Sequence, residues 1–154
     1  MVDRHSDLLT NLKSQTLQNC LNLRLQSVSA NRDQIGRRVF IFRAGQWDPS
    51  VCSLDDIFRC NVLYLQRLAS EKETQVNGIV AIVDLKGFGL YQARHFTPGH
   101  ARRIAELIKD SFPIRFQAIH LIHEPWIFGM VLSIIWPFLS GKIQNRVSFT
   151  ASVM

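Results

Sequence analysis

The chain has 154 residues, of which 47% are hydrophobic and 19% are charged. This length fits one domain with a buried core, and the hydrophobic content excludes an intrinsically disordered chain. The formal net charge of +6 favours an anionic partner: nucleic acid, an acidic membrane surface or an acidic protein.

The first half of the chain begins with a polar, leucine-spotted segment, 1–26, which is interpreted as a helix. Charged residues and a glycine over 31–38 indicate a turn, and the apolar residues 39–43 then predict a short strand. A second helix is predicted from Ser53, because a hydroxyl followed by two acidic residues is typical of a capped helix start.

This second helix carries an apolar stripe that contains one polar residue. Leu54, Phe58, Leu65 and Leu68 follow helical spacing once Asn61 is included. A buried amide without a partner is costly. We therefore expect Asn61 to hydrogen-bond the polar end of a largely apolar ligand.

The second half of the chain alternates strands and helices. Residues 79–85 and 116–122 are almost continuously apolar, which is typical of strands that are covered on both faces. Thr97 and Pro98 mark the start of a helix between them, and Pro113 marks its end. This order predicts an α/β fold with a mostly parallel sheet.

The segment Trp126–Leu139 is almost wholly apolar and leads into a basic stretch that ends at Arg146. A helix that is apolar all round either lies inside the core or faces lipid. The segment is too short to span a bilayer, which takes about 20 apolar residues, and it contains Pro137. No signal peptide is recognised at the charged N-terminus. We expect a soluble protein that contacts membranes.

Candidate sites for metal or covalent chemistry are few. His120 and His123 lie at a strand without a third ligand nearby, so no metal site is predicted. Asp84 has no nucleophile at a motif spacing and is expected to act as a cap. The turn 87–89 lacks the third glycine of a dinucleotide-binding loop. We therefore expect no enzymatic activity and no cofactor.

The three cysteines, Cys20, Cys52 and Cys60, are odd in number and form no CxxC pair. This spacing implies neither a disulfide framework nor a zinc site. We expect reduced thiols, as in a cytosolic protein.

A series of short motifs runs through the chain in a fixed order. The motifs are 73–79 (ETQVNGI), 84–85 (DL), 96–98 (FTP), 110–113 (DSFP), 119–125 (IHLIHEP) and 137–139 (PFL), followed by Lys142, Ile143 and Arg146. Over residues 31–147 they resemble the CRAL-TRIO lipid-binding family, most closely its tocopherol carriers. Such a match is more specific than any single motif.

The resemblance implies a domain, 31–147, that encloses one hydrophobic ligand between a mostly parallel sheet and helices, with residues 123–146 as a mobile lid that inserts at membranes. It leaves 1–30 as a short helical remnant and 148–154 as a divergent tail. Because the family continues with a further strand, the fold is expected to be incomplete at the C-terminus and to expose a sheet edge.

The resemblance also implies functional residues. Arg115, Lys142 and Arg146 match basic residues that contact phosphoinositide head groups in tocopherol carriers, whereas Gln117 replaces another member of that cluster. The implied ligand contacts, including the lid positions, are Phe58, Asn61, Leu65, Ile79, Val83, Phe96, Ile104, Leu107, Ile108, Phe112, Ile119, Phe128, Leu132 and Ile135.

The sequence thus predicts intracellular binding and transfer of a small hydrophobic lipid, tocopherol-like or retinoid-like, between membranes, with coupling to phosphoinositides. The implied location is cytoplasmic, peripheral to endosomal or other intracellular membranes. One alternative is a degenerate interaction module that has lost transport. Another is a basic nucleic-acid binder, but no nucleic-acid motif accompanies the charge and no nucleic-acid partner is expected.

Overall fold

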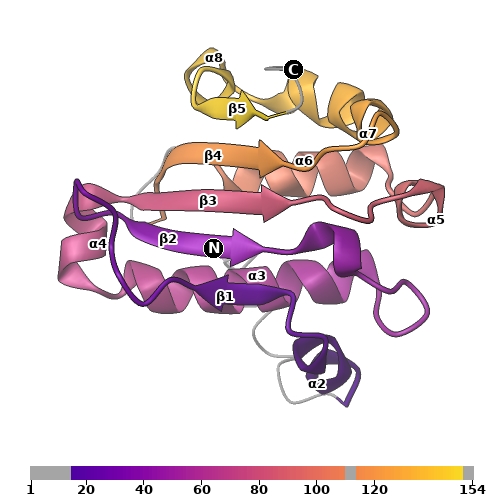
Figure 1. Cartoon of the computed structure of the whole chain (residues 1–154), viewed down its shortest axis with the longest axis horizontal. Helices are drawn as coiled ribbons and strands as arrows, with labels where there is room; N and C mark the ends of the chain where they lie inside the picture. The colour runs from indigo at the N-terminus through magenta and orange to yellow at the C-terminus, as the bar shows by residue number, and fades with distance from the viewer. Residues whose placement is uncertain (1–14, 110–113, 151–154) are drawn as a thin grey trace, which may run out of the picture.

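The computed structural model describes residues 15–109 and 114–150, which form a five-stranded sheet in the order β1-β2-β3-β4-β5 (Figure 1). Strands β2 to β5 are parallel, and β1 pairs antiparallel with β2. The predicted α/β fold with a mostly parallel sheet is confirmed. The strands are β1 Gln26–Val28, β2 Arg38–Phe42, β3 Ile79–Asp84, β4 Phe116–Ile122 and β5 Val147–Phe149.

Helices α3 and α6 cover one face of this sheet, behind it in the view of Figure 1, and α7 packs beside α6. The main hydrophobic core lies between this face and the helices. The helices are α2 Gln15–Asn22, α3 Leu54–Ala69, α4 Lys72–Asn77, α5 Leu90–Ala93, α6 Pro98–Leu107, α7 Phe128–Ile135 and α8 Gly141–Gln144, with 3-10 helices η1 Ala44–Gln46 and η2 Trp136–Phe138.

The two helices on the sheet begin where the sequence predicts. Ser53 caps α3, because its hydroxyl accepts a hydrogen bond from Asp56 N at 3.2 Å. Thr97 caps α6 in the same way by accepting from His100 N at 3.3 Å, and Pro98 is the first helical residue. Helix α6 ends earlier than expected: its last helical residue is Leu107 and Ile108 leaves the helical conformation, whereas the expected end, residue 112, lies outside the described residues.

The prediction of a helix over 1–26 is wrong for its last residues. Helix α2 ends at Asn22, Arg24 takes a left-handed conformation with φ 56°, and the chain then enters β1. The first 14 residues of this expected helix lie outside the described residues. Helix α4 ends at Asn77, because Gly78 takes a positive φ of 88° and the chain then enters β3.

The apolar segment Trp126–Leu139 is not one helix. Helix α7 ends at Ile135, and the chain tightens into the 3-10 helix η2. Pro137 explains the break, since its ring removes a backbone N–H and clashes with the preceding turn of an α-helix.

The tail does not leave the edge of β4 unpaired. Residues 147–149 form β5, which pairs in parallel with Ile119–Leu121. Alternating residues of β5 pack against the core through Val147 and Phe149, while Ser148 faces away. The expected open edge beside β4 is therefore filled.

The expectation of three reduced thiols is wrong for two of them. Cys20 of α2 and Cys52, just before α3, form a disulfide across 32 residues, and Cys60 is free and buried. Both half-cystines lie in a second hydrophobic cluster, which joins α2 to the start of α3 and includes Trp47 and Ile57. Sequence spacing does not reveal the pair, because only the fold brings α2 against α3.

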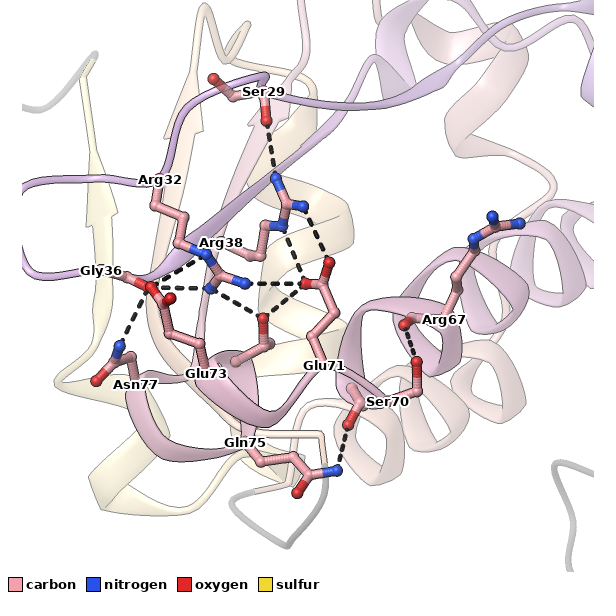
Figure 2. A network of polar contacts seen from close by, with 12 residues as sticks. Ser29, Arg32, Gly36, Arg38, Arg67, Ser70, Glu71, Glu73, Gln75 and Asn77 are labelled. Atoms are coloured by element: carbon pink, nitrogen blue, oxygen red, sulfur yellow. Dashed lines mark hydrogen bonds and ion pairs between the residues drawn. The ribbon is translucent and has the colours of Figure 1, made fainter.

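A polar network ties the turn before β2 to the connection between α3 and α4 (Figure 2). Arg38 donates two hydrogen bonds to the Glu71 carboxylate, at 3.0 and 2.9 Å, and Arg32 adds a third at 3.2 Å. The buried Thr74 hydroxyl donates to the same carboxylate at 2.8 Å. Arg38 and Thr74 together lower the pKa of Glu71 to about 2, although partial burial acts in the opposite direction.

We expect Glu71→Gln to lower the free energy of unfolding near neutral pH by about 1–2 kcal/mol, a value reduced for the solvent that reaches this one-third exposed carboxylate. Because the folded pKa is depressed from 4.5 to about 2, the contribution is complete above pH 4.5 and is lost as the pH falls to about 2. Urea unfolding of both proteins at several pH values measures it. A difference that does not shrink with acid would contradict this assignment, and Glu73→Gln, at a more exposed partner of Arg32, should cost less.

Candidate ligand-binding cavity

A cavity of about 230 Å³ lies between the sheet and helices α3, α6 and α7, and its surface is almost entirely apolar. Strand side chains on one face form its floor, because alternate residues of a strand share a face. Phe40 and Phe42 of β2 alternate in this way, as do Ala81 and Val83 of β3. Ligand pockets usually measure roughly 300–1,000 Å³, so this conformation suits a small or slender apolar molecule.

The fold gathers nearly all of the expected ligand residues around this cavity. Ile79 is an exception, because it is fully buried in the core at the first position of β3. Phe112 lies outside the described residues. The expected residues that line the cavity are Phe58, Asn61, Leu65, Val83, Phe96, Ile104, Leu107, Ile108, Ile119, Phe128, Leu132 and Ile135.

Sequence reasoning missed several further wall residues. Phe40 and Phe42 were detectable, since they alternate on a predicted strand beside the strand that carries Val83. Trp47 and Val147 were not, because Trp47 lies in a loop and Val147 is the last residue of the expected domain, where no strand was predicted.

Three polar residues of the cavity wall are engaged by other protein groups. Gln92 donates to the carbonyls of Gly45 and Trp47, at 3.3 and 3.2 Å, and accepts from Gly89 N at 2.8 Å. Arg103 forms an ion pair with Asp55 of α3.

His100 completes this set. Its Nδ1 caps α6 at Thr97, and its Nε2 lies 3.7 Å from Asp55. Burial lowers the pKa of His100, with Asp55 acting in the opposite direction. These contacts place a charged bridge between α3 and α6 at the rim of the apolar cavity.

Asn61 is the remaining polar wall residue. Its Oδ1 accepts a hydrogen bond from Gln26 Nε2 at 2.9 Å. Within residues 15–109 and 114–150, its Nδ2 has no hydrogen-bond acceptor. Asn61 thus offers an N–H donor beside an apolar cavity.

The segment 123–146, expected to act as a lid, closes one side of the cavity. Phe128, Leu132 and Ile135 line it, and Phe128 packs edge-on against Phe88 with ring centroids 5.4 Å apart. The outer side of the segment is also apolar, and Trp126 is 85% exposed. Both sides of this segment therefore present apolar surface, one to the cavity and one to the exterior.

The expected basic cluster gathers at the N-terminal ends of β4 and β5. Arg115 donates to the carbonyls of Gln75 and Val76, at 3.2 and 2.9 Å. Arg146 donates to Phe116 O at 3.1 Å. These two guanidinium groups hold backbone in place, whereas Lys142 lies exposed in α8. Lys142 is therefore the member that can be substituted with the least damage to the fold.

The two histidines at β4 each contact a side chain elsewhere in this chain. His120 Nδ1 lies 2.5 Å from Ser148 Oγ, and His123 Nδ1 lies 3.0 Å from Asp84 Oδ1. Asp84 also accepts from Lys86 N, as expected of a cap. Burial acts to raise the pKa of Asp84, but the hydrogen bonds from His123 and Lys86 lower it overall. Within the described ranges, no three residues form a metal-binding group.

None of the described helices is both long and apolar enough to cross a membrane.

Comparison with known proteins gives consistent relatives. An alpha-tocopherol transfer protein-like protein of Mus musculus is 39% identical over 140 residues, covering 91% of this chain and 41% of that protein. Clavesin-1 of Xenopus laevis is 36% identical over 143 residues, covering 92% of this chain and 43% of that protein. The crystal structure of Sfh5 matches the fold with a TM-score of 0.63 at 17% identity, covering 93% of this chain and 57% of that one.

The chain spans less than half the length of these curated relatives. The family model described as the CRAL/TRIO domain matches residues 25–153, a range that includes β1 and β5 at the two ends of the sheet. Because this model covers most of the chain and the relatives are 36–39% identical, the chain belongs to the CRAL/TRIO domain family.

Proposed function

We propose that this chain binds one small hydrophobic lipid in the cavity, transfers it between membranes and catalyses no covalent chemistry. The observation that carries the proposal is an almost wholly apolar cavity lined by residues of the sheet and three helices. An unfilled space of this kind is unfavourable for stability, because protein interiors are otherwise densely packed. Tocopherol-like and retinoid-like lipids, which combine a slender apolar body with a small polar group, match the apolar lining of this cavity.

Asn61 is proposed as the anchor for the polar group of this lipid. Asn61→Leu should weaken binding of a long-chain alcohol about fivefold more than binding of the matching alkane, because a hydrogen bond of about 1 kcal/mol is lost only with the alcohol. Displacement of a fluorescent lipid by each probe measures both affinities. The ratio of the two cancels any general damage from the substitution. Equal losses for both probes would make Asn61 a purely structural hydrogen-bonding residue.

Delivery is proposed to begin at the surface formed by α5, α7 and η2. Leu90, Tyr91, Trp126, Met130 and Phe138 are all exposed there. Aromatic residues of this kind sit well at a membrane interface. The basic cluster would then approach anionic phosphoinositide head groups when segment 123–146 moves outward. We propose that the protein acts at the cytoplasmic surface of intracellular membranes.

Lys142→Ala should weaken binding to phosphoinositide-containing vesicles about fivefold, since a basic residue near an anionic membrane contributes about 1 kcal/mol. Added salt should weaken binding of the unsubstituted protein as well, because the Debye length is about 8 Å at physiological ionic strength. Vesicle co-sedimentation measures both effects. Arg67→Ala, which removes the same charge from an exposed position on α3, is the matched control and should change little. Binding indifferent to salt and to Lys142→Ala would remove the head-group role.

A further inference from the structure

Gln26 is a buried polar residue at the edge of the sheet, and only 6% of it is exposed. In the register of β1 with β2 it lies opposite Phe42, which lines the cavity. Directly opposed residues of paired strands share a face. Gln26 is therefore on the cavity side of the sheet, although the sequence placed it at the end of a helix.

The side chain of Gln26 reaches across to α3. Its Nε2 donates to Asn61 Oδ1 at 2.9 Å, between residues 35 positions apart. An asparagine amide has one acceptor end and one donor end, and with Gln26 as the donor the acceptor end of Asn61 is engaged. Here the remaining end is Nδ2, on a residue that lines the cavity.

The other polar wall residues do not compete for this role. Gln92 is engaged through both ends of its amide, and His100 and Arg103 are held near Asp55 at the rim. Among the described residues, the hydrogen-bonding group that the cavity offers to a ligand is therefore set by the orientation of the Asn61 amide.

We propose that Gln26 is a specificity-determining residue: by engaging Asn61 Oδ1 it makes the cavity select lipids that carry a hydrogen-bond acceptor. This inference rests on the proposed lipid binding. A ketone, ether or hydroxyl oxygen would accept from Asn61 Nδ2. A lipid whose polar group only donates would leave both its own N–H and the Asn61 N–H without an acceptor, which is unfavourable in an apolar cavity.

Three probes of equal chain length test the proposal by displacement of a fluorescent lipid: an alkane, a methyl ketone that only accepts, and an alkylpyrrole that only donates. The unsubstituted protein should bind the ketone about fivefold to tenfold more tightly than the alkane, with no such gain for the pyrrole. In Gln26→Leu the Asn61 amide is released and turns either end to the ligand. The pyrrole should then gain about fivefold to tenfold over the alkane, while the ketone keeps its advantage.

A second variant makes the test independent of how well Gln26→Leu folds. Gln26→Glu, at about pH 9 where the carboxylate is ionised, accepts from Asn61 Nδ2 and turns Oδ1 toward the cavity. The preference should then reverse in favour of the pyrrole. If the probes bind but the preference is unchanged in both variants, this inference is wrong and lipid binding stands. If no probe, including the alkane, binds the unsubstituted protein, both proposals are wrong.

Discussion

Replacing Ile104 with tryptophan should weaken lipid binding by at least about tenfold while leaving the protein folded. Ile104 lines the cavity from α6 and is only partly buried, so a larger side chain there extends into the cavity. An indole ring occupies much of a cavity of about 230 Å³ and excludes the ligand directly. The cost to stability should stay near 1–3 kcal/mol, as is typical of larger side chains in a packed interior.

The measurement is displacement of a fluorescent lipid, with circular dichroism as the check on folding. Ile35→Trp is the matched control, because the same substitution then falls in an exposed turn where the isoleucine is 68% exposed. It should bind lipid as the unsubstituted protein does. Unchanged lipid affinity in Ile104→Trp would show that this cavity is not the binding site.

Removal of the Cys20–Cys52 disulfide should lower the free energy of unfolding by about 3–4 kcal/mol. The bond closes a loop across 32 residues, and a cross-link of that span restricts the unfolded chain strongly. The double substitution Cys20→Ser and Cys52→Ser should therefore unfold at markedly lower urea concentration. Treating the unsubstituted protein with a strong reductant should give a similar loss once the two buried half-cystines are reached.

Cys60 provides the control for this measurement. It is fully buried, and burial raises the pKa of its thiol to about 11, so it remains a protonated thiol that exchanges slowly with the disulfide. The Cys60→Ala variant should lose as much unfolding free energy on reduction as the unsubstituted protein does. If the double variant and the unsubstituted protein unfold together under oxidising conditions, the cross-link contributes nothing.

The central elements of the fold were predictable because local signals and burial agree there. The strand predicted at 116–122 matches β4 residue for residue, and β3 differs from its predicted range only at its C-terminal end. The starts of α3 and α6 followed from Ser53 and Thr97, whose hydroxyls cap as expected. In these segments the apolar pattern and the cap residues point to the same structure.

The remaining features depend on contacts between distant parts of the chain. No spacing rule pairs Cys20 with Cys52, and nothing local shows that Gln26 meets Asn61 across 35 residues. Strand β5 has only three residues, and its pairing with the free edge of β4 stabilises it more than its own strand propensity does. The cavity wall was foreseen through family resemblance, and its polar residues became interpretable only with their partners in view.

The central claim is that the cavity holds a lipid, and native mass spectrometry of the protein purified from a lipid-rich cell extract tests it most directly. We expect a bound species that denaturing extraction identifies as a neutral lipid with a hydrogen-bond acceptor. It should be retained by Ile35→Trp and absent from Ile104→Trp. A protein that carries no lipid, or one that carries it equally in both variants, would contradict the account and favour an interaction module built on the same fold.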